Sequence, residues 1–221
     1  MPTRIGLIGD VHASPAPLKQ ALEIFESEAV SKIICTGDIA GYFEHLTEAI
    51  ELLEANQCET IIGNHDQSFL NDNPDLKESS EYSFLQNLPE TLEYEIDNIR
   101  ILVVHAHPPD HQHGGIKLLD QNGLLIEKQK QHWINELAEF DHDVLIVGHT
   151  HQVFAEQIGN TFVVNPGSSQ FNHSCMILSL PDLSVQTFAL EDQSILKSWN
   201  FSHLFGKAVA YPPAKNKFTS R

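Results

Sequence analysis

Residues Gly63-Asn64-His65-Asp66 directly follow the short apolar run Thr60-Ile61-Ile62, at the point where a buried strand would run into a loop. An amide oxygen, an imidazole and a carboxylate stand side by side here, behind a glycine that leaves the backbone free to turn. Gly, Asn and Asp are also common turn residues, so this stretch alone fits a polar turn equally well. The residues at the other strand ends of the chain favour a functional site over a simple turn.

Five apolar runs end in residues of this kind. A single histidine at a strand end is readily explained as a hydrogen-bonded surface residue, but here that explanation has to hold at several strand ends at once. The four remaining runs and their endings are residues 4–9 with Asp10-Val11-His12, residues 32–36 with Gly37-Asp38, residues 99–104 with His105-Ala106-His107, and residues 144–147 with Gly148-His149-Thr150-His151.

Helical patterns separate the first three runs. Ser14-Pro15 predicts an N-cap followed by proline in the first turn, and Leu18, Leu22 and Phe25 continue at helical spacing. A second helical pattern covers residues 46–53. Alternating strands and helices predict a parallel sheet, in which ligand sites form at the carboxyl ends of the strands. The residues expected on this one edge are Asp10, His12, Asp38, Asn64 and His65.

The remaining chain predicts further helices and antiparallel strands. Asp97-Asn98 is typical of a two-residue hairpin turn. Residues 205–221 are polar and predict a packed arm or a frayed end. The other expected elements are partly helical residues 67–90, a helix over 124–140, and strands over 93–96, 99–104, 153–158, 161–164, 174–180 and 185–190.

Composition narrows the class of protein. The 221 residues fit one domain over 1–221, with 191–221 as a C-terminal extension, and no apolar run approaches the ~20 residues of a membrane span. The first residues lack the pattern of a signal peptide, so we expect a cytoplasmic protein without membrane contact. A net charge of −17 argues against binding extended nucleic acid. Three cysteines without a C-x-x-C pair predict neither disulfides nor a thiolate zinc site.

The strand-end residues supply carboxylates, imidazoles and one amide, and no thiolate. This donor set suits divalent ions such as Mn, Fe or Zn. In an extended segment, residues two apart point to the same side, so Asp10-Val11-His12 and His149-Thr150-His151 could each offer both outer side chains to a common centre.

With these residues assembled, residues 4–190 resemble the calcineurin-like metallophosphoesterase superfamily, whose signature is this ordered series of five motifs. Three segments resemble its small prokaryotic phosphodiesterase-like branch: GDIAGY (37–42), GNHD (63–66) and NPGS (165–168). The resemblance implies an α/β fold, a four-layer αββα sandwich of two mixed β-sheets flanked by helices. It also implies two divalent metal ions (Mn, Fe or Zn) between the sheets.

The resemblance also implies roles for single residues. His65 would be the proton donor, oriented by Asp66. The fourth motif departs from the His-Gly of many members, because this chain reads His105-Ala106-His107; we expect His105 to be the ligand and His107 to be a substrate contact or a spare ligand. The implied ligands are Asp10, His12 and His151 for one ion, Asn64, His105 and His149 for the other, and Asp38 for both.

The implied reaction is hydrolysis of a phosphodiester or phosphoanhydride by in-line attack of a metal-bridging hydroxide. Imidazole suits proton transfer near neutral pH, so His65 would protonate the leaving oxygen. The arginines Arg4, Arg100 and Arg221 are not adjacent to any motif, and arginine is the usual clamp for a phosphate dianion. We therefore expect phosphodiesters to be preferred over phosphomonoesters, unless a lysine such as Lys117 replaces the clamp.

Other functions remain as alternatives. A non-catalytic binding or scaffold protein on the same fold would be expected to lack ligands or the catalytic histidine, and this chain has them all. A phosphomonoesterase is the second alternative. The acidic charge disfavours a nuclease acting on long polymers, which leaves a small phosphorylated substrate, with a nucleotide as one candidate. No pattern in the sequence predicts an oligomeric state, and we expect His111 and His113 to lie in a solvated loop.

Overall fold

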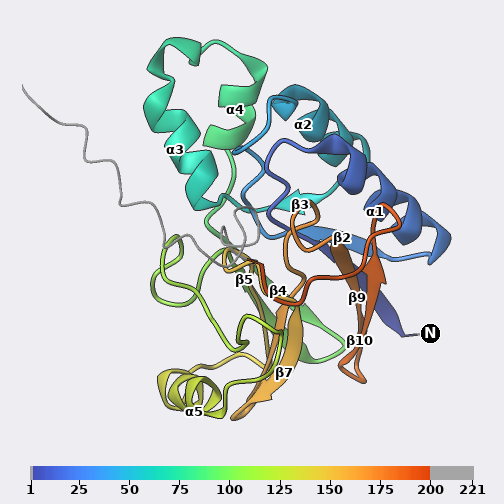
Figure 1. Ribbon diagram of the computed structural model, residues 1–221, viewed down its shortest axis with the longest axis vertical. Coiled ribbons are helices and arrows are strands. Elements are labelled where there is room, and N and C mark those ends of the chain that lie inside the picture. Colours follow the sequence, from blue (N-terminus) through green and yellow to red (C-terminus); the bar gives the residue numbers. More distant parts are fainter. Residues whose placement is uncertain (1, 200–221) are drawn as a thin grey trace, which may run out of the picture.

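The first of two mixed β-sheets combines the N-terminal strands with the last two strands. The computed structural model describes residues 2–199 (Figure 1). The sheet contains β1 (Thr3–Ile8), β2 (Lys32–Cys35), β3 (Glu59–Thr60), β9 (Ser174–Leu180) and β10 (Ser184–Ala189). Their order is β10-β9-β1-β2-β3; β1, β2 and β3 run parallel, while β9 pairs antiparallel with both β1 and β10. The predicted parallel arrangement of the first three strands is confirmed.

The second sheet is built from the middle of the chain. Its strands are β4 (Thr91–Ile96), β5 (Ile99–Val104), β6 (Val144–Ile146), β7 (Phe154–Ile158) and β8 (Thr161–Asn165), in the order β4-β5-β6-β8-β7. The predicted hairpin joins β4 to β5, and its two turn residues, Asp97 and Asn98, have φ of +53° and +61°. Two consecutive positive φ values are those of the type I′ turn, which follows the twist of the strands.

Helices cover the outer faces of the two sheets. They are α1 (Pro15–Ser27), α2 (Leu46–Ala55), α3 (Asn64–Asp72), α4 (Ser80–Gln86) and α5 (Glu127–Glu136), with a 3₁₀ turn at Pro74–Leu76. The expected stripe of Leu18, Leu22 and Phe25 is buried on α1. Figure 1 shows α1 and α2 on one side of the molecule and α5 on the opposite side.

Three apolar cores lie between the layers. One lies between the first sheet and α1, α2 and α4; a second lies between the two sheets; a third lies between the second sheet and α5. Alternation along β5 separates the last two, because Ile101 and Val103 face the first sheet while Leu102 and Val104 face α5 and its Trp133. The order of layers is helix, sheet, sheet, helix, so the predicted four-layer αββα sandwich is confirmed.

Some elements are shorter than their apolar patterns. The strand expected at 60–62 is Glu59–Thr60, and the helix expected at 124–140 is α5. Tyr82 and Leu85 are buried on α4, and Cys35 is a core residue. The expectation for residues 205–221 falls outside the described residues. The single domain over 1–221 with a C-terminal extension over 191–221 stays a prediction. The structure describes residues 191–199 of that extension. Within residues 2–199, no helix is long and apolar enough to cross a membrane.

Candidate metal centre

The strand-end loops of both sheets meet at one edge of the sandwich. The first sheet contributes the loops after β1 and β2 and, beyond β3, the first turn of α3. The second sheet contributes the loops after β5 and β6. Their side chains form three overlapping groups, within each of which the candidate ligand atoms lie within 4.8 Å of one another. The first group is Asp10, His12 and His151, the second is Asp38, His105 and His149, and the third is His12, Asp38 and His65.

The first group contains two imidazoles that face each other. His12 Nε2 lies 3.0 Å from His151 Nε2, which lies 3.5 Å from Asp10 Oδ1. His12 Nδ1 lies 3.3 Å from the carbonyl oxygen of Ala40. A carbonyl only accepts, so this contact places the proton on Nδ1 and directs the Nε2 lone pair into the group, as second-shell contacts do in metal sites.

The second group adds the amide oxygen of Asn64. This oxygen lies 3.1 Å from His105 Nε2 and 2.8 Å from His149 Nδ1. His105 Nδ1 donates to the carbonyl oxygen of Thr36 at 2.7 Å, so Nε2 is the nitrogen that points into the group. Two ring nitrogens, an amide oxygen and the Asp38 carboxylate therefore converge here.

Asp38 lies between these two groups. Its Oδ1 is 3.4 Å from His105 Nε2, and the carboxylate is also near His12 and His65. The same Oδ1 accepts the backbone N–H of His65 at 2.8 Å. Asp38 is therefore in contact distance of ligands in both groups, which is the position a bridging carboxylate requires.

Burial and charge set the protonation of these groups. Burial lowers the pKa of His12 and of His149 to about 4, so both rings are neutral at pH 7. Burial also disfavours ionised Asp10 and Asp38, but His151 lowers the pKa of Asp10 and His105 lowers that of Asp38. Ionised carboxylates, the neutral imidazoles of His12 and His149 and an amide fit hard to borderline divalent ions, which agrees with the predicted donor set.

His105 is expected to release a proton when a metal ion binds. Burial alone lowers the pKa of His105, but the Asp38 carboxylate outweighs burial and raises the pKa to about 9. A ligand must be unprotonated, so a metal ion competes with this proton below pH 9, and the affinity should rise about tenfold per pH unit up to that value. Calorimetry of Mn²⁺ binding at pH 7 in buffers of different ionisation enthalpy should show about one proton fewer released by His105→Asn than by the wild type. Equal proton release by the two proteins would contradict this protonation state.

The backbone at five candidate ligand positions is left-handed, which corrects the expectation of extended segments. The φ values are +48° at Asp10, +51° at His12, +53° at Asp38, +65° at His149 and +48° at His151. His149 and His151 belong to different groups, whereas Asp10 and His12 share one. Non-glycine residues in this region cost about 1–3 kcal/mol each and persist only where the surroundings fix them.

Gly63 and Asp66 fix the loop that carries Asn64 and His65. Gly63 has an extended φ of −107°, so it is required for space and not for a left-handed turn: a Cβ there would lie 2.2 Å from Asp38 Oδ1. The Asp66 carboxylate accepts the backbone N–H groups of Ala40 at 2.7 Å and Gly63 at 2.8 Å. A contact between the Asp66 carboxylate and the His65 ring was expected, and this expectation is wrong. Both carboxylate oxygens of Asp66 accept backbone N–H groups instead.

Asp66→Ala is expected to lower the free energy of unfolding by about 2–6 kcal/mol. Asp66 is fully buried, and its loss leaves two buried N–H groups without an acceptor, at about 1–3 kcal/mol each. Urea denaturation checks this, with Asp72→Ala on the exposed end of the same helix as the control, which should stay within about 0.5 kcal/mol of the wild type. Similar midpoints for the two variants would show that the carboxylate does not hold the loop.

Two asparagines for which no role was predicted connect the site loops. Asn165, at the end of β8, donates to the Gly148 carbonyl at 2.9 Å and to Thr150 Oγ1 at 3.1 Å. Asn172, fully buried, donates to the His151 carbonyl at 3.0 Å. The only signal in the sequence was the NPGS segment, whose Ser168 donates to the Asp10 carbonyl at 2.6 Å.

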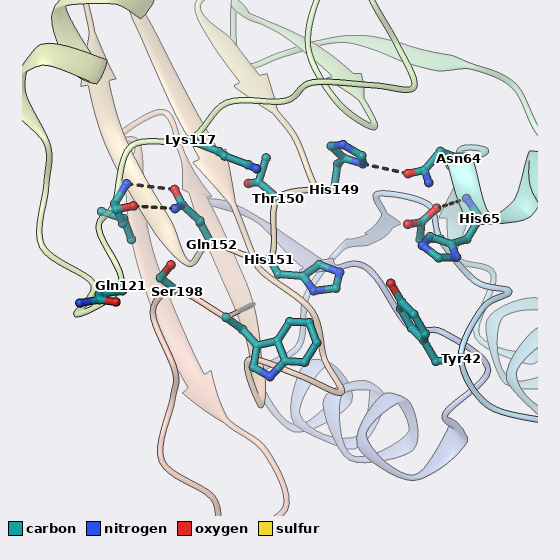
Figure 2. Close-up of a pocket in the computed structure, with 13 residues that line it drawn as sticks. Tyr42, Asn64, His65, Lys117, Gln121, His149, Thr150, His151, Gln152 and Ser198 are labelled. Atoms are coloured by element: carbon teal, nitrogen blue, oxygen red, sulfur yellow. Dashed lines mark hydrogen bonds between the residues drawn. The ribbon is translucent and has the colours of Figure 1, made fainter. Parts of the chain in front are cut away.

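A pocket of about 330 Å³ opens above the ligand groups (Figure 2). Asn64, His65 and Tyr42 lie on one side, Lys117, Gln121 and Ser198 lie on the other, and His149 and His151 lie between them. The Tyr42 ring centroid is 4.9 Å from that of His65. The lining residues are Asp38, Tyr42, Asn64, His65, Lys117, Leu119, Gln121, His149, Thr150, His151, Gln152, Ser198 and Trp199.

The later histidines lie outside the ligand groups formed by the described residues. His107 packs its ring 5.2 Å from that of Trp133, and its Nδ1 donates to the Pro108 carbonyl at 2.9 Å. His111 Nδ1 lies 3.3 Å from Glu90 Oε2 in a partly exposed loop. His105 is thus the histidine of the fourth motif that enters the site.

Three comparisons place the chain among known proteins. Phosphodiesterase MJ0936 from Methanocaldococcus jannaschii is 28% identical over 164 residues, which cover 74% of this chain and 82% of that protein. The crystal structure of hypothetical protein PH1004 from Pyrococcus horikoshii has a TM-score of 0.71 at 18% identity, over 86% of this chain and 88% of the other. A metallophosphoesterase from Sphaerobacter thermophilus has a TM-score of 0.62 at 23% identity, over 86% and 89%.

At 18% and 23% identity, the similarity to these two solved structures shows a shared fold. The relative named phosphodiesterase supports the small prokaryotic branch that the motifs predicted. Residues 3–181 match the family model of the calcineurin-like phosphoesterase superfamily domain. Because this match covers most of the chain and includes every motif at the site, the protein belongs to the calcineurin-like phosphoesterase superfamily.

Proposed function

We propose that the protein hydrolyses phosphodiesters or phosphoanhydrides with the help of two divalent metal ions, Mn, Fe or Zn. The observation that carries this proposal is the pair of ligand groups that converge around one buried, ionised carboxylate at the base of a pocket. The named phosphodiesterase among the relatives supports the reaction class. The residues that would hold the ions are Asp10, His12 and His151 for one, Asn64, His105 and His149 for the other, and Asp38 for both.

Divalent ions, when bound, polarise the phosphoryl group and lower the pKa of water, which supplies a nucleophile at neutral pH. The chain itself supplies orientation and a proton. His65 lines the pocket beside the ligand groups, and its backbone N–H donates to Asp38. Its ring packs against His12 and Tyr42, with centroids 5.0 Å and 4.9 Å away. In this position His65 would protonate the leaving oxygen of the substrate.

The charges around the pocket favour a substrate with a singly charged phosphate. Arg4 pairs with Glu28 at 2.7 Å and Arg100 pairs with Asp141 at 2.8 Å, and neither lines the pocket. Among the described residues that line the pocket, Lys117 is the one lysine, and no arginine is among them. The described part of the pocket therefore has no arginine that could bind a dianionic phosphomonoester with two parallel hydrogen bonds, as arginine does in other phosphate sites.

We expect kcat/KM for bis-p-nitrophenyl phosphate to exceed that for p-nitrophenyl phosphate by about tenfold or more, as one missing charge-assisted contact predicts. The measurement uses protein stripped of metal and reloaded with Mn²⁺. Faster hydrolysis of the monoester would favour the phosphomonoesterase alternative. Bound metal with no hydrolysis of either ester would favour the non-catalytic binding or scaffold protein.

A further inference from the structure

We propose that Lys117 binds a second phosphate of the substrate, so that the preferred substrate is a small phosphodiester that carries another phosphate on the part not released. This inference rests on the proposed function. Lys117 lines the same pocket as the ligand groups, and its neighbours on that side, Gln121 and Ser198, offer hydrogen-bond donors. Asp38 is the sole carboxylate among the described lining residues, and it belongs to the ligand groups.

The backbone on both sides of Lys117 is fixed to the loop that carries His151. Lys117 is exposed, while its neighbours Ile116 and Leu118 are fully buried. Thr150 Oγ1 donates to the Ile116 carbonyl at 3.1 Å, and Gln152 Oε1 accepts the Leu118 N–H at 2.8 Å. Thr150 and Gln152 are the residues directly before and after His151. The position of Lys117 is therefore fixed relative to a metal ligand, as a binding residue requires.

Two further contacts make this attachment close. Gln152 also accepts the Leu119 N–H at 3.0 Å and donates to the Leu119 carbonyl at 2.8 Å. Gly115, with φ of +78°, lies so near the loop that a Cβ would be 2.5 Å from Thr150 Cγ2 and 2.9 Å from His149 Cδ2. Segment 115–119 thus packs directly on the ligand loop, and Gln152 is a buried side chain used to hold it.

The arrangement across the pocket indicates which part of the substrate Lys117 meets. Figure 2 shows His65 and Lys117 on opposite sides, with His149 and His151 between them. The leaving oxygen takes its proton from His65, so the leaving group departs on that side. The group that stays on the phosphorus is equatorial in the in-line transition state, so it can extend away from His65 toward Lys117. An ammonium ion there favours an anion, and lysine binds phosphate as a point charge.

The test compares dinucleotides that differ by one terminal phosphate. Thymidylyl-(3′→5′)-thymidine is assayed beside the same compound with a 5′-phosphate or a 3′-phosphate, using the Mn²⁺-loaded full chain. For the better of the two phosphorylated forms, we expect kcat/KM about 10- to 100-fold above that of the unphosphorylated one, as one charge-assisted contact predicts. In Lys117→Gln this ratio should fall to about one, and in Lys117→Arg it should be largely retained.

Lys128→Gln, at an exposed position of α5, is the matched control and should keep the wild-type ratio. A wild-type ratio near one, or a ratio that Lys117→Gln leaves unchanged, overturns the inference. The second case includes an equal loss on all three dinucleotides, which would place Lys117 on the reacting phosphate instead. If no ester is hydrolysed, the proposed function fails. The inference about Lys117 is then decided by calorimetry, which measures the affinity of the wild type and the three variants for the same three compounds. The ratio of affinities for phosphorylated and unphosphorylated dinucleotide then replaces the ratio of kcat/KM.

Discussion

His65→Ala is expected to hydrolyse thymidylyl-(3′→5′)-thymidine about 10²- to 10⁴-fold more slowly than the wild type, with the same number of bound metal ions. The leaving alkoxide of this substrate is strongly basic, so its departure depends on a proton. The p-nitrophenolate of bis-p-nitrophenyl phosphate leaves readily without one, so the loss there should be smaller. A variant that is slower on both substrates by the same factor would show that His65 is not the proton donor.

Metal content separates this role from that of a ligand. The ring of His65 is near enough to His12 and Asp38 to complete a third ligand group. If His65 were a ligand, His65→Ala would also retain fewer ions after dialysis, as measured by plasma mass spectrometry. His132→Ala, at an exposed position of α5, is the matched control and should match the wild type in both rate and metal content.

Asp38→Asn is expected to weaken binding of both metal ions by at least about 10- to 100-fold and to lower kcat/KM by more than about 10³-fold. The affinity estimate is a minimum, because changes at residues that only support a ligand already cost that much. The rate estimate follows from the several kcal/mol that metal ions contribute to transition-state stabilisation. Asp38 is grouped with His12, a proposed ligand of one ion, and with His105 and His149, proposed ligands of the other, and its ionised form is held by His105.

Asp10→Asn is the informative comparison, because Asp10 belongs to one group only. This variant should show weaker binding of one ion and normal binding of the other in a Mn²⁺ titration. Weakening of a single ion in Asp38→Asn would contradict the shared position of this carboxylate. Thermal melting of the metal-free proteins verifies that both variants fold, because Asp38 also accepts the N–H of His65.

The sequence was sufficient for the fold because its signals are local and regular. Alternating runs and helical stripes predicted the parallel strands and the helices, whereas the four layers were implied by the family resemblance. The rule that ligands lie at the carboxyl ends of parallel strands placed Asp10, Asp38 and Asn64 on one edge. His105 and His149 also follow apolar runs, β5 and β6, and the family resemblance assigned them to the same site. These predictions depend only on where a strand ends, and that point is marked clearly when an apolar run meets polar residues.

The details of the site were not predictable in the same way. Left-handed backbone at Asp10 and His149 is contrary to the preference of these residues, and it is imposed by contacts with distant loops. The contact of Asp66 with Ala40 joins residues 26 apart, and that of Asn172 with His151 joins residues 21 apart. Side-chain hydrogen bonds of this range leave no periodic signal in a sequence. Irregular segments such as 115–119 are positioned by such contacts together with the burial of single side chains, here Ile116 and Leu118.

The ligand groups take residues from both sheets, and this has a consequence for how the molecule comes apart. Asp10, His12 and Asp38 follow strands of the first sheet, whereas His105, His149 and His151 follow strands of the second. An ion held by both sets would bind only while the sheets stay together at this edge. Resistance to heat would then depend on metal concentration, with about 2.7 kcal/mol added at a free ion level 100 times the dissociation constant. In this way the cation supply around the protein would regulate its lifetime as well as its turnover.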